Sequence, residues 1–163
     1  MAITYVALGS NLNQPVIQLK KAIIGLSQLT NTSLLQVSSL YENPPLTADS
    51  EQANYVNAVA KLQTTLSPMS LLIELLELER RQGRQRDGRR WQARTLDLDI
   101  LLYDHECINT IELTIPHPGL TLRSFVIYPL LEIAPNLILP NGIRLESFKK
   151  EVLNNLCRVE QFS

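Results

Sequence analysis

Four stretches of the chain have the residue pattern of β-strands. They cover residues 3–8, 33–41, 54–64 and 95–103. The first is rich in β-branched and aromatic residues, and the third alternates with a period of two. In the third stretch, one face holds Val56, Ala58, Ala60 and Leu62, and the other holds Tyr55, Asn57 and Val59. On this pattern alone, Tyr55 and Asn57 are expected to be exposed strand residues.

Two of the intervening segments have apolar residues at helical spacing. The first follows Pro15, and its stripe is Val16, Leu19, Ile23 and Leu26. The second begins at Ser67-Pro68 and ends before Gly83, and its stripe is Met69, Leu72, Ile73 and Leu76. Two further helices are expected, a short one in residues 125–135 and an amphipathic one near residues 145–156.

The order of these elements is strand, helix, strand, strand, helix, strand. This order predicts an α+β fold: a ferredoxin-like split β-α-β sandwich, with an antiparallel sheet and its helices on one face, plus a C-terminal helical extension. No repeat, low-complexity tract or linker divides the chain, so residues 1–163 are expected to form a single domain.

Two carboxylates interrupt the last predicted strand. Asp97 and Asp99 are two residues apart, so they share one face of the strand, about 6.6 Å apart along the backbone. Leu96, Leu98, Ile100 and Leu102 are expected on the opposite face. Two like charges this close repel each other, and a divalent cation would reverse the sign of that interaction. A solvated sheet face with local salt bridges is the alternative, because this tripeptide pattern alone is common.

Composition excludes several classes of protein. The chain has 163 residues, of which 45% are hydrophobic and 19% are charged, and its formal net charge is −1. No global field would attract nucleic acid or an anionic membrane. The start of the sequence lacks a secretory-signal pattern, and no apolar run approaches the roughly 20 residues of a membrane span. Cys107 and Cys157 lack metal-ligand spacing. We therefore expect a soluble, cytoplasmic protein.

Positive charge is concentrated just before the carboxylates. The seven arginines are Arg80, Arg81, Arg84, Arg86, Arg89, Arg90 and Arg94. Guanidinium groups bind phosphate oxygens through two hydrogen bonds, and Trp91 among them suggests an aromatic cover. Together with a carboxylate pair, this set is typical of a phosphoryl-transfer site. Neither a Walker motif nor a kinase glycine-rich loop is present, and a solvated basic loop remains the alternative.

Eight motifs in order resemble those of the 6-hydroxymethyl-7,8-dihydropterin pyrophosphokinase family, over nearly the whole chain. They are LGSN (8–11), YENPPL (41–46), YVNAV (55–59), LSP (66–68), E-x3-GR-x-R (79–86), R-W-x2-RTLDLDILLY (90–103), L-T-IPHP (113–118) and R-x-FV-x2-PL-x-EIAP (123–135). The resemblance implies transfer of pyrophosphate from ATP to the hydroxymethyl group of the pterin, with release of AMP, in folate biosynthesis.

The resemblance also implies roles for individual residues. Two Mg²⁺ ions would be held by Asp97 and Asp99, with ATP as co-substrate. The catalytic set would be Arg84, Arg94, Asp99, Arg90 and Trp91. The pterin site would be Asn43, Pro44, Leu46, Tyr55, Asn57, Trp91 and Phe125, with Asn43 to Leu46 acting through the backbone. The ATP site would be Glu79, Arg84, Arg86, Arg94, Ile100, Thr114, His117 and Arg123.

Three departures from the commoner pattern stand out: Asn43 in place of threonine, Thr47 in place of glycine, and Gln92-Ala93 in place of Gly-Pro. The last concerns the closing geometry of the arginine segment rather than the chemistry. The expected partners are the two small substrates, and a monomer is expected, with a dimer as the alternative. A ferredoxin-like RNA-binding module is disfavoured, because its central strand would carry aromatic residues where this one carries carboxylates. A different Mg²⁺-dependent phosphotransferase is the closer rival.

Overall fold

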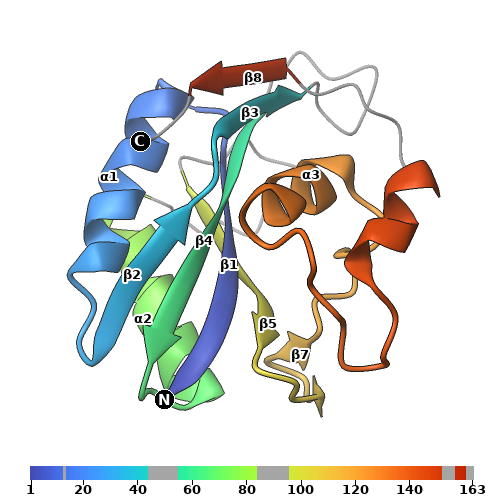
Figure 1. Cartoon of the computed structure of the whole chain (residues 1–163). Helices are drawn as coiled ribbons and strands as arrows, with labels where there is room; N and C mark the ends of the chain where they lie inside the picture. Colours follow the sequence, from blue (N-terminus) through green and yellow to red (C-terminus); the bar gives the residue numbers. More distant parts are fainter. Residues whose placement is uncertain (13, 44–54, 84–95, 152–156, 161–163) are drawn as a thin grey trace.

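An antiparallel β-sheet with helices on both faces forms the body of the protein (Figure 1). The structure is a computed structural model that describes residues 1–12, 14–43, 55–83, 96–151 and 157–160. Among these residues, the sheet consists of β1 (Ala2–Ser10), β2 (Thr32–Val37), β3 (Leu40–Asn43), β4 (Tyr55–Thr64), β5 (Asp97–Tyr103) and β8 (Cys157–Glu160). A small hairpin is formed by β6 (Ile108–Asn109) and β7 (Thr114–Ile115).

The strand order is β5-β1-β4-β3-β8, and β2 pairs with the other half of β4. The predicted strand 33–41 is therefore two strands, divided at Ser38-Ser39, where Ser38 turns its hydroxyl to accept the Val59 N–H at 2.9 Å. When β2 and β3 are counted as one strand, the four predicted strands stand in the order 4-1-3-2, with every pairing antiparallel. The split β-α-β topology that the sequence predicts has this arrangement.

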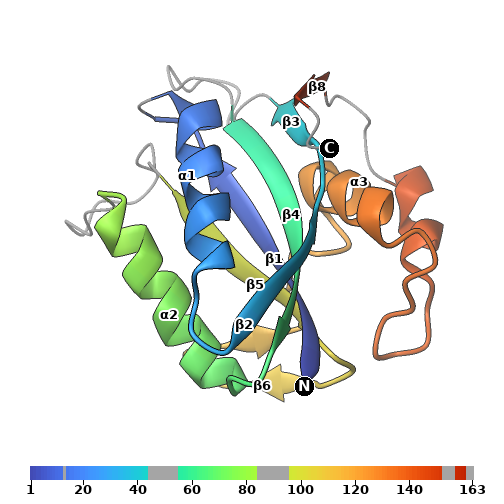
Figure 2. The same ribbon diagram turned by 60° about the vertical axis from the view of Figure 1, so that its left-hand side comes forward.

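The two longest helices cover one face of the sheet, as predicted (Figure 2). They are α1 (Pro15–Ser27) and α2 (Pro68–Arg81), and the hydroxyl of Ser67 caps α2 by accepting the Ser70 N–H at 3.2 Å. The other face carries α3 (Ser124–Ile133) and the 3₁₀ helix η1 (Leu145–Glu151). Each face thus has its own apolar cluster, and the sheet separates the two clusters.

The predicted C-terminal helix is observed over residues 145–151, as a 3₁₀ helix, and the strand that follows it was not predicted. A helix was expected near residues 145–156, but η1 ends at Glu151 and residues 152–156 lie outside the described residues. The chain then forms β8, which pairs antiparallel with β3 from Leu40 to Glu42. The unpaired backbone groups of an edge strand offer a partner to any extended segment, and this constraint is not visible in the periodicity of the segment itself.

The predicted apolar stripe of α2 is wrong at three of its four positions, and only Leu72 packs against the core. The side chains of Met69, Ile73 and Leu76 are 42%, 60% and 37% exposed. The buried face instead consists of Leu71, Leu75, Leu78 and Glu79. Leu78 packs against the bare backbone of α1 at Gly25, where a Cβ atom would lie only 2.6 Å from its Cδ1. Because α2 has two apolar stripes, the tertiary contacts and not the spacing decide which one turns inward.

One position of β5 was also assigned to the wrong face. The pairing of β1 with β5 shifts register between Tyr5 and Val6, which are opposite Leu102 and Ile100. Leu101 is therefore the extra residue of a β-bulge. Before the bulge, Leu98 and Ile100 join the core under α1 and α2, as predicted, but Leu102 packs with Tyr5 on the α3 side.

A carboxylate from α3 fastens that helix to the sheet. Glu132 accepts hydrogen bonds from the backbone N–H of Ser39 at 3.0 Å, from the Ser39 hydroxyl at 2.8 Å and from the Tyr41 hydroxyl at 2.5 Å. Arg158 of β8 donates to the same Tyr41 oxygen at 3.3 Å, and its guanidinium lies over the Tyr41 ring. Burial, followed by the bond to Glu132, raises the pKa of Tyr41, so this hydroxyl stays a donor. One carboxylate thus connects α3, β3 and β8.

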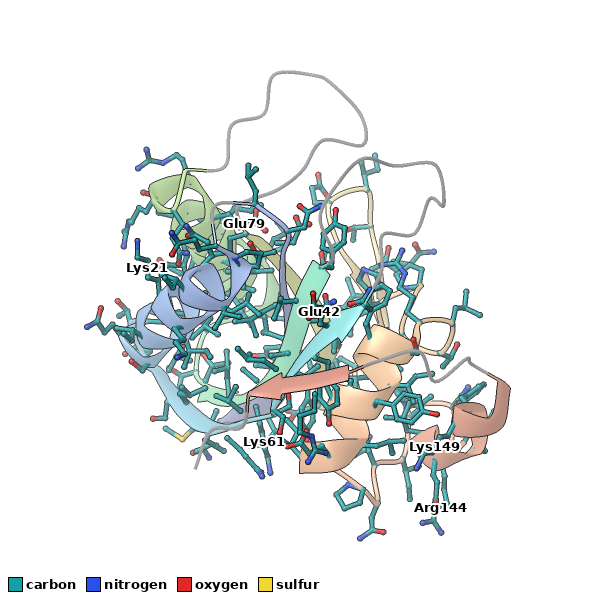
Figure 3. All side chains as sticks on the ribbon, turned by 90° about the horizontal axis from the view of Figure 1, so that it is seen from above. Lys21, Glu42, Lys61, Glu79, Arg144 and Lys149 are labelled. Carbon is teal, nitrogen blue, oxygen red and sulfur yellow. The ribbon has the colours of Figure 1, made fainter. Side chains whose placement is uncertain are left out.

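Replacing Glu132 with alanine should lower the free energy of unfolding by about 2 kcal/mol. The reason is that buried donors of Ser39 and Tyr41 lose their acceptor. Urea denaturation measures the change. The matched control is Glu146→Ala, which removes an exposed carboxylate paired with Arg144 at the edge of the molecule (Figure 3) and should change stability by less than about 0.5 kcal/mol. Equal effects of the two substitutions would contradict this role of Glu132.

Candidate active site

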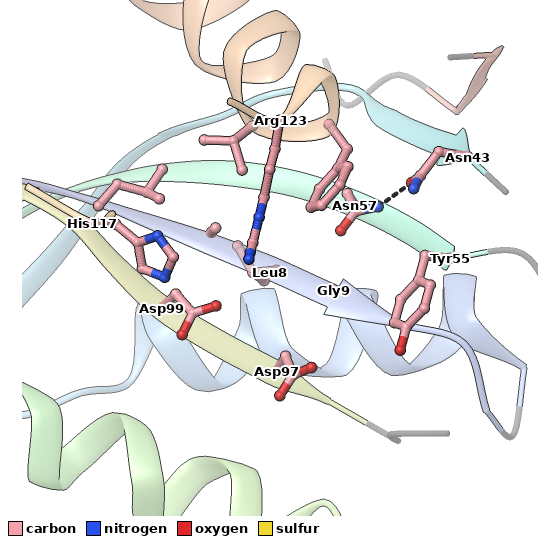
Figure 4. Close-up of a pocket in the computed structure, with 13 residues that line it drawn as sticks. Leu8, Gly9, Asn43, Tyr55, Asn57, Asp97, Asp99, His117 and Arg123 are labelled. Atoms are coloured by element: carbon pink, nitrogen blue, oxygen red, sulfur yellow. Dashed lines mark hydrogen bonds between the residues drawn. The ribbon is translucent and has the colours of Figure 1, made fainter. Parts of the chain in front are cut away.

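Three strands form the floor of a pocket on the α3 side of the sheet (Figure 4). In the register of these strands, Gly9 of β1 lies opposite Asn57 of β4 on one side and opposite Asp97 of β5 on the other. In the next row, Ala7 lies between Val59 and Asp99. On the pocket face, β1 has only a glycine and an alanine at these two positions, while Leu8 between them also lines the pocket and belongs to the core cluster under α1 and α2. The floor is therefore low between two rows of larger side chains. Because β4 and β5 are two strand spacings apart, the Cα atoms of Asn57 and Asp97 are separated by about 10 Å.

Aromatic side chains stand at one end of this floor. Tyr55 begins β4 at the rim, and Phe125 descends from the first turn of α3, so both line the pocket. The guanidinium carbon of Arg123 lies 5.8 Å from the centre of the Phe125 ring. Tyr55, Asn57 and Phe125 were predicted to form a pterin site, and the structure brings all three together around one cavity. Such a cavity has apolar faces for a flat ring and polar groups for its edge.

The polar groups at this end belong to two asparagines. Asn57 donates a hydrogen bond from its side-chain nitrogen to the side-chain oxygen of Asn43, which ends β3 (Figure 4). Both side chains are buried and line the pocket. The sequence predicted a backbone role for Asn43, whereas the structure also gives its side chain a contact within the site.

The carboxylates stand at the other end of the floor. Asp97 is half-buried and Asp99 is exposed, and both face the pocket, as the strand alternation predicts. Between them, the backbone N–H of Leu98 donates to the carboxylate of Glu79 at 2.7 Å on the helix side of the sheet. Glu79 is 2% exposed and does not line the pocket. The structure therefore places this predicted nucleotide residue behind β5, where it holds the strand that carries the aspartates.

A second pocket adjoins the first. The two share Asp99 and His117, and the second is otherwise lined by residues of α2, β5 and the β7 hairpin, including Leu72, Ile100 and Thr114. Ile100, Thr114 and His117 were predicted to contact the nucleotide, and the structure brings them together here. Arg123, predicted for the same group, lines the first pocket instead, near His117.

His117 is held at the junction of the two pockets in a defined tautomer. Its backbone N–H donates to the Leu101 carbonyl at 3.0 Å, and its ring Nδ1 accepts the Gly119 N–H at 3.0 Å. The neutral ring therefore has its proton on Nε2. Burial lowers the pKa of His117, Asp99 acts in the opposite direction and Arg123 reinforces the lowering. At neutral pH the ring is thus a neutral hydrogen-bond donor.

The chemistry of the two aspartates suits a hard divalent cation. Among the described residues, no group of three or more His, Cys, Asp or Glu side chains could hold a metal ion by itself. Mg²⁺, however, commonly binds through one or two carboxylates together with substrate phosphates and water. Asp97 and Asp99 face a cavity and supply this smaller set, so the residues fit such an ion.

Several predicted site residues lie outside the described residues. They are Pro44, Leu46, Arg84, Arg86, Arg90, Trp91 and Arg94. Their roles stay predictions from the sequence. The two segments that contain them adjoin the ends of β3, β4, α2 and β5, which are the elements that line the two pockets.

Comparison with known proteins decides the family. Residues 5–135 match the sequence model of 7,8-dihydro-6-hydroxymethylpterin-pyrophosphokinase (HPPK). The chain belongs to the HPPK family. A Haemophilus influenzae 2-amino-4-hydroxy-6-hydroxymethyldihydropteridine pyrophosphokinase is 56% identical over 142 residues, which are 87% of this chain and 88% of the relative. A Pseudomonas aeruginosa protein of the same name is 46% identical and covers 86% of each chain. The family activity is that of a pyrophosphokinase in folate biosynthesis.

Solved structures agree on the HPPK fold. A Plasmodium falciparum HPPK-DHPS crystal structure with pteroate aligns with a TM-score of 0.74 and 13% identity, over 92% of this chain and 42% of that chain. The wild-type protein with SDX-DHP aligns with a TM-score of 0.69 and 13% identity, over 93% and 43%. This chain thus spans less than half of those longer proteins. At this identity the likeness concerns the fold alone. Among the described residues, the helices fall short of the length and apolar character that a membrane span needs.

Other residues of this HPPK site escaped prediction from the sequence. Gly9 and Ala7 matter because they are small, and only the cross-strand register reveals that they lie between the functional rows. Gly119 allows Arg123 to approach, since a Cβ atom there would lie 2.7 Å from the arginine Nε. The LGSN motif was a signal for Gly9, although the sequence did not give its physical reason.

The lowered pKa of His117 predicts how stability depends on pH. Below about pH 6.5, the usual value for histidine, the unfolded chain binds a proton more readily than the folded protein. The contribution of His117 to the free energy of unfolding is therefore present above pH 6.5 and is lost as the pH falls below it. His117→Gln should have a smaller loss of stability between pH 7.5 and pH 5 than the wild type, as measured by urea denaturation. An equal or larger loss in the variant would contradict the lowered pKa.

Proposed function

We propose that the protein transfers the β,γ-pyrophosphoryl group of ATP to the hydroxymethyl oxygen of 6-hydroxymethyl-7,8-dihydropterin. The observation that carries this proposal is the row Asn57-Gly9-Asp97, in which a polar ring-binding side chain and a carboxylate flank a bare floor. A flat ring at the Asn57 end would direct its substituent toward the carboxylates of β5. The backbones of β4 and β5 are about 10 Å apart, which is two strand spacings. Residues 1–163 are proposed to act as one domain.

The pterin would lie between Tyr55 and Phe125. The two aromatic side chains and the low floor at Gly9 suit a flat heterocycle, and Asn57 offers both a donor and an acceptor to its edge. Pro44, Leu46 and the backbone of Asn43 would complete the edge, by resemblance to the family.

The nucleotide would occupy the second pocket, with its phosphates near the junction at Asp99 and His117. Leu72 and Ile100 give this pocket an apolar wall for a base, and Thr114 adds a hydroxyl. The neutral His117 ring can donate from Nε2 to a phosphate oxygen, and the Arg123 guanidinium adds positive charge nearby. Glu79 supports this site from behind β5 and need not touch the nucleotide.

Asp97 and Asp99 would hold Mg²⁺, with two ions expected. The bound metal would supply neutralisation of the triphosphate charge and would orient its oxygens. The hydrogen bond from the Leu98 N–H to Glu79 would hold the backbone between the two aspartates in place from the other side of the sheet.

The reaction would proceed by attack of the pterin hydroxyl oxygen on the β-phosphorus. The new bond joins this oxygen to the β-phosphorus, the bond between the β-phosphorus and the α,β-bridging oxygen breaks, and AMP leaves with that oxygen. The hydroxyl proton would pass to Asp99 or to solvent. Arg84 and Arg94 would neutralise charge on the transferred group, Arg86 and Arg90 would assist, and Trp91 would close over the pterin.

The expected setting is a cytoplasmic monomer that acts on these two small molecules and on neither nucleic acid nor membrane. The formal net charge of −1 supports the absence of a nucleic-acid partner.

With ATP, Mg²⁺ and the hydroxymethyl dihydropterin, the wild-type protein should form AMP, and only when the pterin is present. Asp97→Ala and Asp99→Ala should each lower this turnover at least a hundredfold, because the phosphate charge loses its metal ligands. Chromatography of the nucleotides measures the product. Both variants should remain folded, because the aspartate side chains face the pocket rather than the core.

Glu106→Ala removes an exposed carboxylate outside both pocket linings and is the matched control, with turnover expected near that of the wild type. Formation of ADP instead of AMP would indicate a simple kinase. Near-wild-type turnover in either aspartate variant would refute the metal assignment.

A further inference from the structure

The side chains of Asn43 and Asn57 form a buried pair at the ring-binding end of the pocket. Asn43 is 4% exposed at the end of β3, and Asn57 is 6% exposed on β4. The hydrogen bond between them runs from the Asn57 nitrogen to the Asn43 oxygen. An asparagine amide can be turned by half a rotation with little change in shape, so the partner atom that faces it decides which of its two ends is turned toward that partner. Here the amino end of Asn57 faces Asn43.

The carbonyl end of Asn57 consequently lies over the floor of the pocket. Its Oδ1 is 2.9 Å from the point where a Cβ atom on Gly9 would stand, so only a glycine leaves room for it there. The oxygen is on the pocket side of β1, and Gly9, Asn43 and Asn57 all line the cavity (Figure 4). A ligand that enters the pocket over Gly9 thus meets a hydrogen-bond acceptor.

We infer that Asn43 is a positioning residue whose side chain turns the Asn57 amide so that Oδ1 receives an N–H group of the bound heterocycle. This inference rests on the proposed function, because the pyrimidinone edge of a pterin has N–H donors next to a carbonyl acceptor. Asn57 keeps a second amino hydrogen for that carbonyl. With Asn43 in its present orientation, turning Asn57 over would bring the carbonyl oxygens of Asn43 and Asn57 together and would place N–H groups against N–H groups at the ligand. The role differs from the backbone contact expected of Asn43, since it depends on the side-chain oxygen.

Two substitutions at Asn43 separate the effect of its acceptor oxygen from the effect of its side-chain size. Leucine has a similar size and cannot accept a hydrogen bond, whereas aspartate keeps the acceptor oxygen. The dissociation constant of 6-hydroxymethylpterin, measured by fluorescence quenching with a saturating non-hydrolysable ATP analogue and Mg²⁺ present, should rise about tenfold in Asn43→Leu. In Asn43→Asp it should stay within about threefold of the wild type. If the leucine variant does not fold, Asn43→Ala removes the same acceptor without added bulk.

A second ligand distinguishes positioning from general damage. The affinity for a non-hydrolysable ATP analogue with Mg²⁺ should be unchanged in both variants, because the nucleotide pocket shares no residue with the asparagine pair. The inference is overturned if Asn43→Leu binds the pterin as tightly as the wild type, if Asn43→Asp loses as much affinity as Asn43→Leu, or if nucleotide affinity falls to the same extent. Failure of the wild type to bind the pterin would instead overturn the proposed function, so the two failures can be told apart.

Discussion

The antiparallel register of β4, β1 and β5 is the constraint on which the site depends. Because side chains alternate along a strand, a slip of one residue would exchange the pocket face with the core face. Burial of Leu8, Ala58 and Leu98 under α1 and α2 opposes any such slip, since it would expose them and bury the aspartates. The apolar face therefore fixes the position of polar groups that it never touches. One register decides that Asn57, Gly9 and Asp97 form a row.

The position of α3 beside the pocket depends on a second, separate attachment to the sheet. Phe125 and Arg123 reach the pocket from the start of α3, and Glu132 near its end binds Ser39 and Tyr41 of the sheet. The break between β2 and β3 exposes the Ser39 N–H that Glu132 accepts, and β8 adds Arg158 to the same cluster. The position of Phe125 in the pocket is thus set by polar contacts at the opposite end of α3. In this way the break between β2 and β3 provides the attachment for α3, the helix that completes the pocket.

Alternation and element order were enough to predict much of this arrangement. The faces of β4 and the shared face of Asp97 and Asp99 follow from the two-residue period of a strand. The strand order agrees with the split β-α-β topology that the order of elements predicts. The motifs added the ring-binding residues, since the pattern alone would leave Tyr55 and Asn57 as exposed strand positions and Phe125 as a core residue. What escaped prediction depends on distant contacts. The bulge at Leu101 moved Leu102 to the other face, Gly25 favoured Leu78 over the exposed stripe of α2, and pairing with β3 added a strand, β8, that the sequence pattern did not predict. The Asn43 side-chain bond likewise requires two strands to be in place.

The central claim is that the ring-binding asparagine and the carboxylates share one floor, two strands apart. Mn²⁺ in place of Mg²⁺, bound with a non-hydrolysable ATP analogue, turns this claim into a distance measurement. Paramagnetic relaxation of the ring proton of bound 6-hydroxymethylpterin, measured by NMR, should place the metal on the order of 10 Å from the heterocycle. The enhancement should disappear in Asp97→Ala. Relaxation of the ring proton that Mn²⁺ leaves unchanged, while the wild-type protein binds both ligands, would contradict the account.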